Sequence, residues 1–163
     1  MRLFFLRHAD AEISGTLSDV DRRLTPAGIE EAQVAAQAVR AMKLNFTLGL
    51  MSPAVRARQT MDIVTKHLPS LPTRTLDQLT SNADPRDFLR ELQSFPRDNR
   101  VLLVSHEPFV SRCIASLIEA SDEPRISVKK ATLACVEVGS PVQRGAGVLL
   151  WLLTNEQMRL MKA

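Results

Sequence analysis

A short apolar run near the amino terminus ends abruptly in polar residues. Leu3-Phe4-Phe5-Leu6 has the length of a buried strand, and Arg7-His8-Ala9-Asp10 follows it directly. A strand buried on both faces of a parallel sheet reads as a continuous apolar run, and its carboxyl end delivers polar groups. Ligands bind at that end in open α/β sheets. The sequence therefore places His8 at the rim of a candidate crevice, with Arg7 beside it.

A second apolar run, residues 47–51, also ends in a signal for a helix. Ser52-Pro53 is expected to cap a helix that continues to about Lys66. Arg56 would lie in its first turn, close to free amide groups that favour an anion. Arg58 is about 200° further round the same helix, so it should point away. Arg56 is therefore a candidate anion ligand, and the alternative is an ordinary surface cation.

The third run, Val101-Leu102-Leu103-Val104, is the clearest strand in the sequence, and Ser105-His106 follows it. In a parallel sheet the carboxyl ends of such strands lie along one edge. Residues far apart along the chain should therefore meet there. The residues expected to converge are Arg7, His8, Arg56 and His106.

Strands alternate with amphipathic helices through most of the chain. Thr25 is a good N-cap and Pro26 suits the first helical position, so a helix should begin there. The remaining strands are expected at residues 73–76, 134–138 and 147–153, the last two pairing with each other towards an edge. This pattern predicts an α/β fold, a three-layer, doubly wound, mostly parallel sheet with helices on both faces. The length suits one domain over residues 1–163.

Composition narrows the function classes. The net charge of +3 is small and the basic residues are scattered, which argues against nucleic acid as a partner. No apolar segment approaches the ~20 residues that cross a bilayer, and none has the form of a signal peptide, so no membrane partner is expected. Cys113 and Cys135 lie in apolar runs without zinc-ligand spacing. We therefore expect a cytoplasmic protein with buried, reduced thiols.

Two guanidinium groups that converge with two imidazoles form a site for a tetrahedral oxyanion, most naturally a phosphoryl group. The sequence contains no glycine-rich phosphate loop, DxD pair or HExxH motif, so we expect no metal and no cofactor. Fixed cations tend to keep a neighbouring imidazole neutral, which is the state a nucleophile needs. His8 is therefore the candidate nucleophile.

These stretches resemble the three signatures of the histidine phosphatase superfamily, also called the phosphoglycerate mutase-like fold. The resemblance rests on Leu6-Arg7-His8-Ala9, on Ser52-Pro53 with Arg56-Ala57 and Gln59-Thr60, and on Ser105-His106. Asp10 and the segment Arg22-Arg23-Leu24-Thr25 are most similar to the small bacterial SixA-type phosphohistidine phosphatases.

The resemblance implies a phosphohistidine intermediate on His8, with phosphate held by Arg7 and Arg56 and a hydrogen bond from His106 to the phosphoryl oxygens. Arg22 falls where the SixA-type branch often carries an arginine near the phosphate, and Ser105 is expected to contact substrate. The implied activity is that of a protein-histidine phosphatase in signal transduction. Its partners would be inorganic phosphate and a phosphotransfer protein that carries a phosphohistidine.

The sequence departs from the family pattern at three places. Ala9 replaces the usual glycine, and Arg23 stands where proline is common. Many members have a glutamate general acid after the third strand, whereas residues 77–82 contain none. Asp77 and Asp84 are the candidate substitutes, but a turn residue and a helix cap, respectively, are the simpler interpretations. An imidazole leaving group needs little acid help, since its pKa is near ~6.5. The missing glutamate therefore favours a phosphohistidine substrate.

Two other functions remain open from the sequence. One is a broad small-molecule phosphomonoesterase, or a mutase, of the same superfamily. A mutase would need more basic residues and a closing segment. The other is a non-catalytic module that binds a phosphoprotein, for which the intact His8 would be unnecessary.

Overall fold

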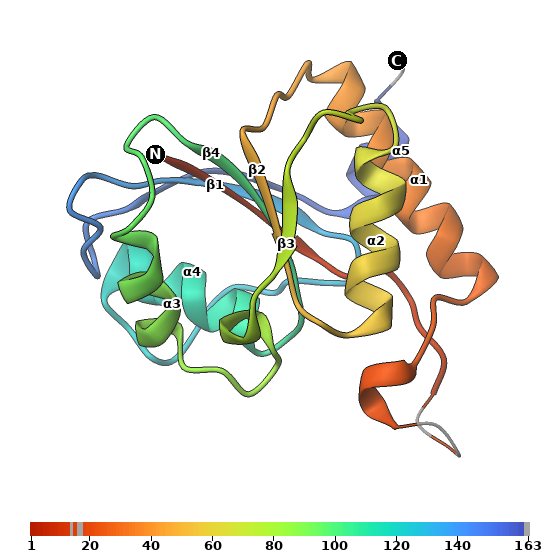
Figure 1. Cartoon of the computed structure of the whole chain (residues 1–163), viewed down its shortest axis with the longest axis horizontal. Helices are drawn as coiled ribbons and strands as arrows, with labels where there is room; N and C mark the ends of the chain where they lie inside the picture. Colours follow the sequence, from red (N-terminus) through yellow and green to blue (C-terminus); the bar gives the residue numbers. More distant parts are fainter. Residues whose placement is uncertain (14, 16–17, 162–163) are drawn as a thin grey trace.

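The sheet combines strands from both ends of the chain. In the computed structural model, which describes residues 1–13, 15 and 18–161, six strands have the order β3-β2-β4-β1-β5-β6 (Figure 1). The strands are β1 (Arg2–Arg7), β2 (Leu48–Met51), β3 (Thr73–Thr75), β4 (Arg100–Ser105), β5 (Leu133–Glu137) and β6 (Val148–Leu153). The pairs β1/β4, β4/β2 and β2/β3 are parallel, whereas β5 is antiparallel to both β1 and β6. The mostly parallel sheet is confirmed.

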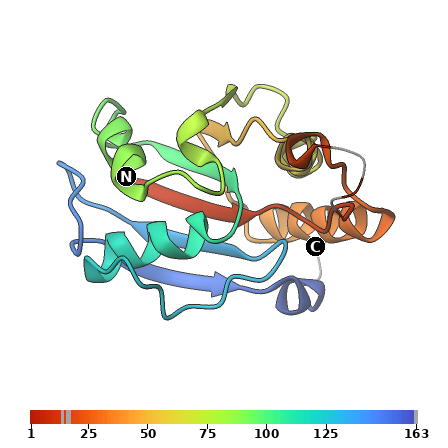
Figure 2. The ribbon, with the colours of Figure 1, turned by 90° about the horizontal axis from the view of Figure 1, so that it is seen from below.

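Helices cover both faces of this sheet (Figure 2). They are α1 (Pro26–Ala41), α2 (Val55–Thr65), α3 (Pro85–Leu92), α4 (Phe109–Glu119) and α5 (Asn155–Arg159). Side chains alternate along β1, so Phe4 and Leu6 pack in one buried cluster with residues of α1, α2 and α5. Leu3 and Phe5 pack in another with residues of α3 and α4. The three-layer α/β architecture is thus as predicted.

Two helix beginnings test the sequence interpretation directly. The hydroxyl of Thr25 accepts a hydrogen bond from the Gly28 amide at 3.0 Å, and Pro26 is the first residue of α1, as predicted. The predicted cap at Ser52-Pro53 is wrong, because α2 begins at Val55 and its N-cap is Ala54, without a side-chain cap. Ser52 is wholly buried just after β2, and its hydroxyl accepts from the amide of Ala54 at 3.4 Å, before the first turn of α2.

The helix α5 was not expected from the sequence. Thr154 and Gln157 form a capping box at its start, with hydrogen bonds in both directions. Met158 is then buried against the cluster on the α1 and α2 face. The threonine and the glutamine three residues later were the available signal.

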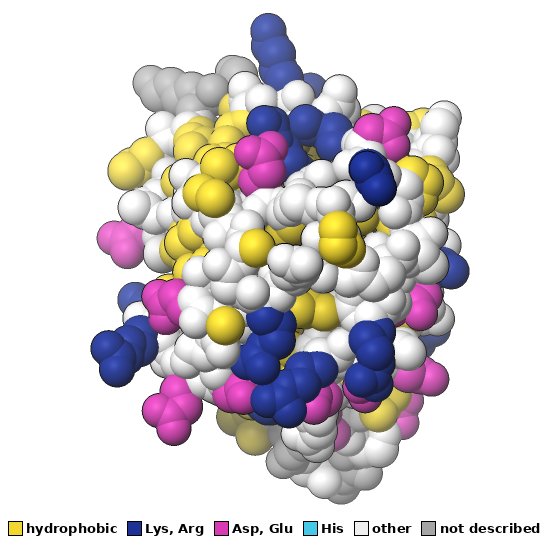
Figure 3. Space-filling view, turned by 90° about the vertical axis from the view of Figure 1, so that its left-hand side faces the viewer, with side chains coloured by type: hydrophobic (Ala, Val, Ile, Leu, Met, Phe, Trp, Pro, Cys, Tyr) yellow, Lys and Arg dark blue, Asp and Glu magenta, His cyan; other side chains and the backbone are white. Residues whose placement is uncertain are grey.

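Basic and acidic side chains are interspersed on the face shown in Figure 3, and apolar side chains gather mainly at its upper left. No helix among the described residues is long and apolar enough to cross a membrane.

Gly28 allows α1 to lie against the segment that follows β1. A Cβ atom at this position would lie 1.9 Å from the backbone oxygen of Asp10. That oxygen also accepts a hydrogen bond from the amide of Thr25 at 3.1 Å, so it has little freedom to move. The close approach of two backbones therefore requires glycine here.

We expect Gly28→Ala to destabilise the protein by about 3 kcal/mol, because either α1 or the segment carrying His8 must shift. Chemical unfolding measures this loss. Gly139→Ala is the matched control, since a Cβ there meets nothing within 4 Å. Equal stability of the two variants would contradict the role assigned to Gly28.

Candidate active site

The carboxyl ends of β1 and β4 bring two histidines together. Arg7 pairs with Ser105 in the parallel register, and the amide of His8 donates to the Ser105 carbonyl at 2.9 Å. The residues that follow, His8 and His106, therefore lie side by side, with their ring centroids 4.8 Å apart. The convergence of these two histidines agrees with the sequence prediction.

Hydrogen bonds define the state of the His8 ring. Its Nδ1 lies 2.7 Å from the carbonyl oxygen of Ala9, an acceptor, so Nδ1 carries the proton. Its Nε2 then has a lone pair, which accepts from Nε of Arg56 at 3.3 Å. Burial, together with the charges of the nearby arginines, lowers the pKa of His8 to about 4, and the Ala9 hydrogen bond opposes this shift. His8 is therefore a neutral imidazole at pH 7.

Arg56 reaches His8 from the first turn of α2, as predicted, and it is buried with only 4% of its surface exposed. Thr60 links the two segments, because its hydroxyl donates to the Arg56 carbonyl at 2.7 Å and accepts from the Ala9 amide at 3.2 Å. Arg58 is exposed, as its position on the helix predicts. The helix therefore presents one arginine to the site and its neighbour to solvent.

Two polar atoms near the site are buried and without a hydrogen-bond partner among the described residues. They are Nε of Arg7 and Nδ1 of His106. The Arg7 guanidinium is otherwise fixed, since its Nη1 donates to the Val128 carbonyl at 2.8 Å. Nε of Arg7 is always a donor, and an unpaired buried donor is costly, so its presence in a cationic site favours an anionic ligand.

The fold alone does not distinguish the many sites that an α/β sheet can carry. A family model described as Histidine phosphatase superfamily (branch 1) matches residues 3–81. This span includes Arg7, His8 and Arg56, which the structure places in contact or in electrostatic range of one another. Over this span the chain is similar to the histidine phosphatase superfamily.

Two SixA matches extend over nearly the whole chain, whereas another relative matches only half of it. Phosphohistidine phosphatase SixA of Escherichia coli (strain K12) is 29% identical over 167 residues, which span 100% of this chain and 99% of that protein. The structure of the protein histidine phosphatase SixA complexed with tungstate has a TM-score of 0.86 at 28% identity, covering 97% of this chain and 99% of the other. The mitochondrial serine/threonine-protein phosphatase PGAM5 of Mus musculus is 35% identical over 81 residues, only 28% of its length.

Ser105 does not have the position expected of a substrate contact in a histidine phosphatase. It is wholly buried, and its hydroxyl donates to the carbonyl of Leu79 at 2.6 Å. The side chain therefore fixes the short 3₁₀ helix η2 (Asp77–Leu79) against β4. Its backbone oxygen still positions His8, as described above, so we correct its role to a structural one.

Asp77 and Asp84, the candidate replacements for the superfamily's glutamate, lie at the starts of helices. Asp84 is the N-cap of α3 and accepts from the Arg86 amide at 2.9 Å. Asp77 is exposed and opens η2. Both agree with the simpler interpretations given above.

The carboxylate that does reach the candidate site is that of Asp19, at the start of the 3₁₀ helix η1 (Asp19–Asp21). It accepts from Nη2 of Arg56 at 2.9 Å and from Nη1 of Arg22 at 2.7 Å. Arg22 thus joins the site through Asp19. The sequence analysis did not single out Asp19.

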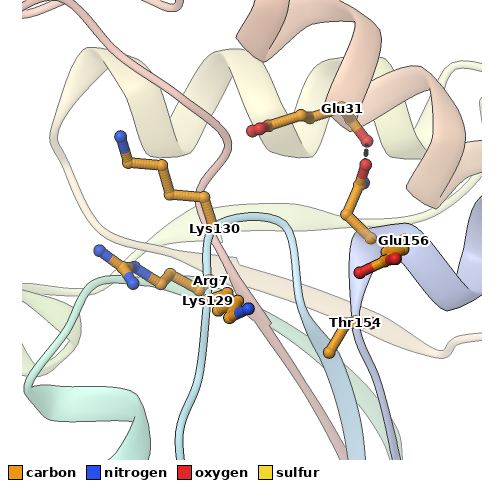
Figure 4. Close-up of a pocket in the computed structure, with 7 residues that line it drawn as sticks. Arg7, Glu31, Lys129, Lys130, Thr154 and Glu156 are labelled. Carbon is orange, nitrogen blue, oxygen red and sulfur yellow. Dashed lines mark hydrogen bonds between the residues drawn. The ribbon is translucent and has the colours of Figure 1, made fainter.

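Arg7 also lines a recess of about 390 Å³ (Figure 4). Lys129 and Lys130 line it together with Glu31 and Glu156, so its charge is mixed. Lys130 also forms an ion pair with Asp10, whose other oxygen accepts from the Thr25 hydroxyl at 2.6 Å. No group of three or more His, Cys, Asp or Glu side chains in the described part of the chain is placed to share a metal ion.

Both site histidines should make the stability of the protein depend on pH. Burial lowers the pKa of His106 to about 3 and that of His8 to about 4. Between pH 6.5 and 4 the unfolded chain binds protons that the folded chain does not, so stability is complete above about pH 6.5 and falls as the pH falls. At pH 5 the loss should be about 2 kcal/mol per histidine.

Urea unfolding at pH 7.5 and pH 5.0 measures this loss. We expect His8→Gln to remove about half of it, whatever its effect on stability at pH 7.5. Hydrogen bonds from Lys130 and Arg22 lower the pKa of Asp10 and Asp19, respectively. These carboxylates therefore change the pH dependence of stability only at more acidic pH. An unchanged difference between the two pH values in the variant would contradict the assigned protonation state.

Proposed function

We propose that this chain is a protein-histidine phosphatase that removes phosphate from a phosphohistidine of a phosphotransfer or signalling protein. The observation that carries the proposal is the neutral His8 ring, whose Nε2 lone pair faces the buried cation Arg56. The full-length similarity to SixA supports the choice of substrate class.

The reaction we propose has two displacements at phosphorus. In the first, Nε2 of His8 forms a bond to phosphorus while the bond from phosphorus to the substrate imidazole breaks, and the released ring takes a proton from solvent. In the second, water attacks the phosphorus, the bond to His8 breaks, and inorganic phosphate leaves. The sum is hydrolysis of the phosphoramidate with His8 regenerated.

The remaining residues act on charge. Arg7 and Arg56 stabilise the equatorial oxygens of the phosphoryl group, and Arg22 supports them from the edge of the site. His106 donates a hydrogen bond, and a bound dianion would raise its pKa and so strengthen that bond. We also propose that residues 1–163 form one domain and that this domain works without a cofactor.

The compartment and the partners follow from the same proposal. Cys113 and Cys135 are both free and buried, which suits a reducing cytoplasm. We propose a phosphohistidine-bearing protein and inorganic phosphate as partners, and neither nucleic acid nor membrane.

A small-molecule phosphomonoesterase is the second candidate. It is favoured only by the similarity to the superfamily, whereas Asp84 caps α3 and Asp77 is exposed at the start of η2, as expected of structural residues. A non-catalytic binding module would not need a neutral nucleophile at the centre of the site.

Competing substrates separate these functions. The purified chain should release phosphate from a phosphohistidine protein with a higher kcat/KM than from phosphoglycerate or a sugar phosphate. Faster turnover of the small phosphates would favour the phosphomonoesterase. Binding of the phosphoprotein without release of phosphate would favour the module.

A further inference from the structure

Asp19 contacts the two arginines, Arg56 and Arg22, that we expect to bind phosphate. The carboxylate of Asp19 accepts from Nη2 of Arg56 at 2.9 Å and from Nη1 of Arg22 at 2.7 Å. The backbone oxygen of Asp19 also accepts from Nη1 of Arg56. Both terminal nitrogens of the buried arginine therefore contact this one residue.

Asp19 lies in the electrostatic field of the whole site. Its negative charge raises the pKa of His106, although burial keeps that pKa low overall. Hydrogen bonds from Arg22 and Arg56 lower the pKa of Asp19 itself, so the carboxylate is ionised at neutral pH. The side chain thus presents a full negative charge to the cations that a phosphoryl group would need.

We propose that Asp19 is an internal competitor of phosphate, holding Arg56 and Arg22 until a phosphoryl group displaces its carboxylate. This inference rests on the proposed function only in taking these arginines as phosphate ligands. It concerns the binding of the anion and not the chemistry at His8.

The exchange of the Asp19 carboxylate for a phosphoryl dianion is expected to be favourable. The Asp19 side chain is 56% exposed, so its carboxylate returns to water at small cost, whereas that of Arg56 is 5% exposed and needs an anion. A phosphoryl group offers more charge and more oxygens than the carboxylate. Inorganic phosphate must make the same exchange, so Asp19 weakens the binding of product and favours its release.

Titration calorimetry with inorganic phosphate at pH 7.5 tests the inference. Asp19→Asn should tighten phosphate binding by roughly tenfold, the factor expected if the carboxylate holds the arginines in about nine molecules of ten. Asp21→Asn is the matched control, because Asp21 lies in the same 3₁₀ helix and contacts Ser18, not the arginines. The control should change the affinity by less than about twofold, since it removes the same charge at an exposed position.

Asp19→Ala should act in the same direction as Asp19→Asn. Weaker or unchanged phosphate binding in both variants would overturn the inference, and would mean that Asp19 positions the arginines. Equal tightening in the Asp21 control would also overturn it, because the effect would then be one of net charge.

The proposed function can fail separately. Suppose that the Asp19 variants bind phosphate more tightly but the protein does not hydrolyse phosphohistidine. This result would support competition between Asp19 and phosphate and would contradict the proposed phosphatase function. Hydrolysis of phosphohistidine with weaker phosphate binding in the variants would do the opposite.

Discussion

His8→Ala is expected to lower kcat/KM for phosphohistidine by at least about 10⁴-fold, because the variant has no atom that can form the covalent intermediate. The remaining cations still bind phosphate, so KM or phosphate affinity should change much less than kcat. Steady-state assays with a labelled phosphohistidine protein measure the loss. Labelled phosphate should be transferred rapidly to the wild-type protein in an acid-labile bond, and not to the variant. This difference identifies the covalent intermediate.

His67→Ala is the matched control for this variant. His67 is exposed just after α2, far along the chain from the site strands, and it should leave turnover unchanged. Activity of His8→Ala near the wild-type level would remove the central assignment. Loss of activity with a retained phosphoenzyme signal would move the nucleophile to another residue.

Arg56→Ala should have the next largest effect. Its side chain is the buried cation nearest to Nε2 of His8, and it would supply two charge-assisted hydrogen bonds to the phosphoryl oxygens. Each is worth roughly 1.5–3 kcal/mol, so kcat/KM should fall by about 10²–10⁴-fold. Inhibition by vanadate should weaken in parallel, because the lost bonds bind the ground-state anion as well.

Arg58→Ala tests whether position rather than charge matters. It removes the same group from the same helix, but Arg58 is exposed. The expected change in kcat/KM is less than about threefold. An unchanged vanadate inhibition constant in Arg56→Ala would exclude Arg56 from the anion site.

The residues of the candidate site that follow the ends of strands could be predicted from the sequence. Apolar runs before Arg7, before Arg56 and before His106 fixed where each strand stops, and parallel pairing then places their ends along one edge. The helical angle between Arg56 and Arg58 decided which arginine faces inward. These features are local or follow from topology, so one sequence contains them.

The rest depends on packing that the sequence pattern does not contain. Ser105 belongs to a strand end like the others, but its hydroxyl meets the Leu79 carbonyl of a distant segment. Asp19 lies in an irregular polar segment, where no periodicity shows which side chain turns inward. Ser52-Pro53 has the composition of a cap, yet the chain runs two residues further before α2 begins. Each of these depends on contacts between separate segments.

A crystal soaked with tungstate tests the central claim most directly. We predict one oxyanion in contact with Arg7, Arg56 and His106, at hydrogen-bond distances of about 3 Å, with Nε2 of His8 facing the tungsten. The Asp19 carboxylate should no longer contact Arg56 in that complex. An oxyanion bound elsewhere, or a His8 ring turned away from it, would contradict the account.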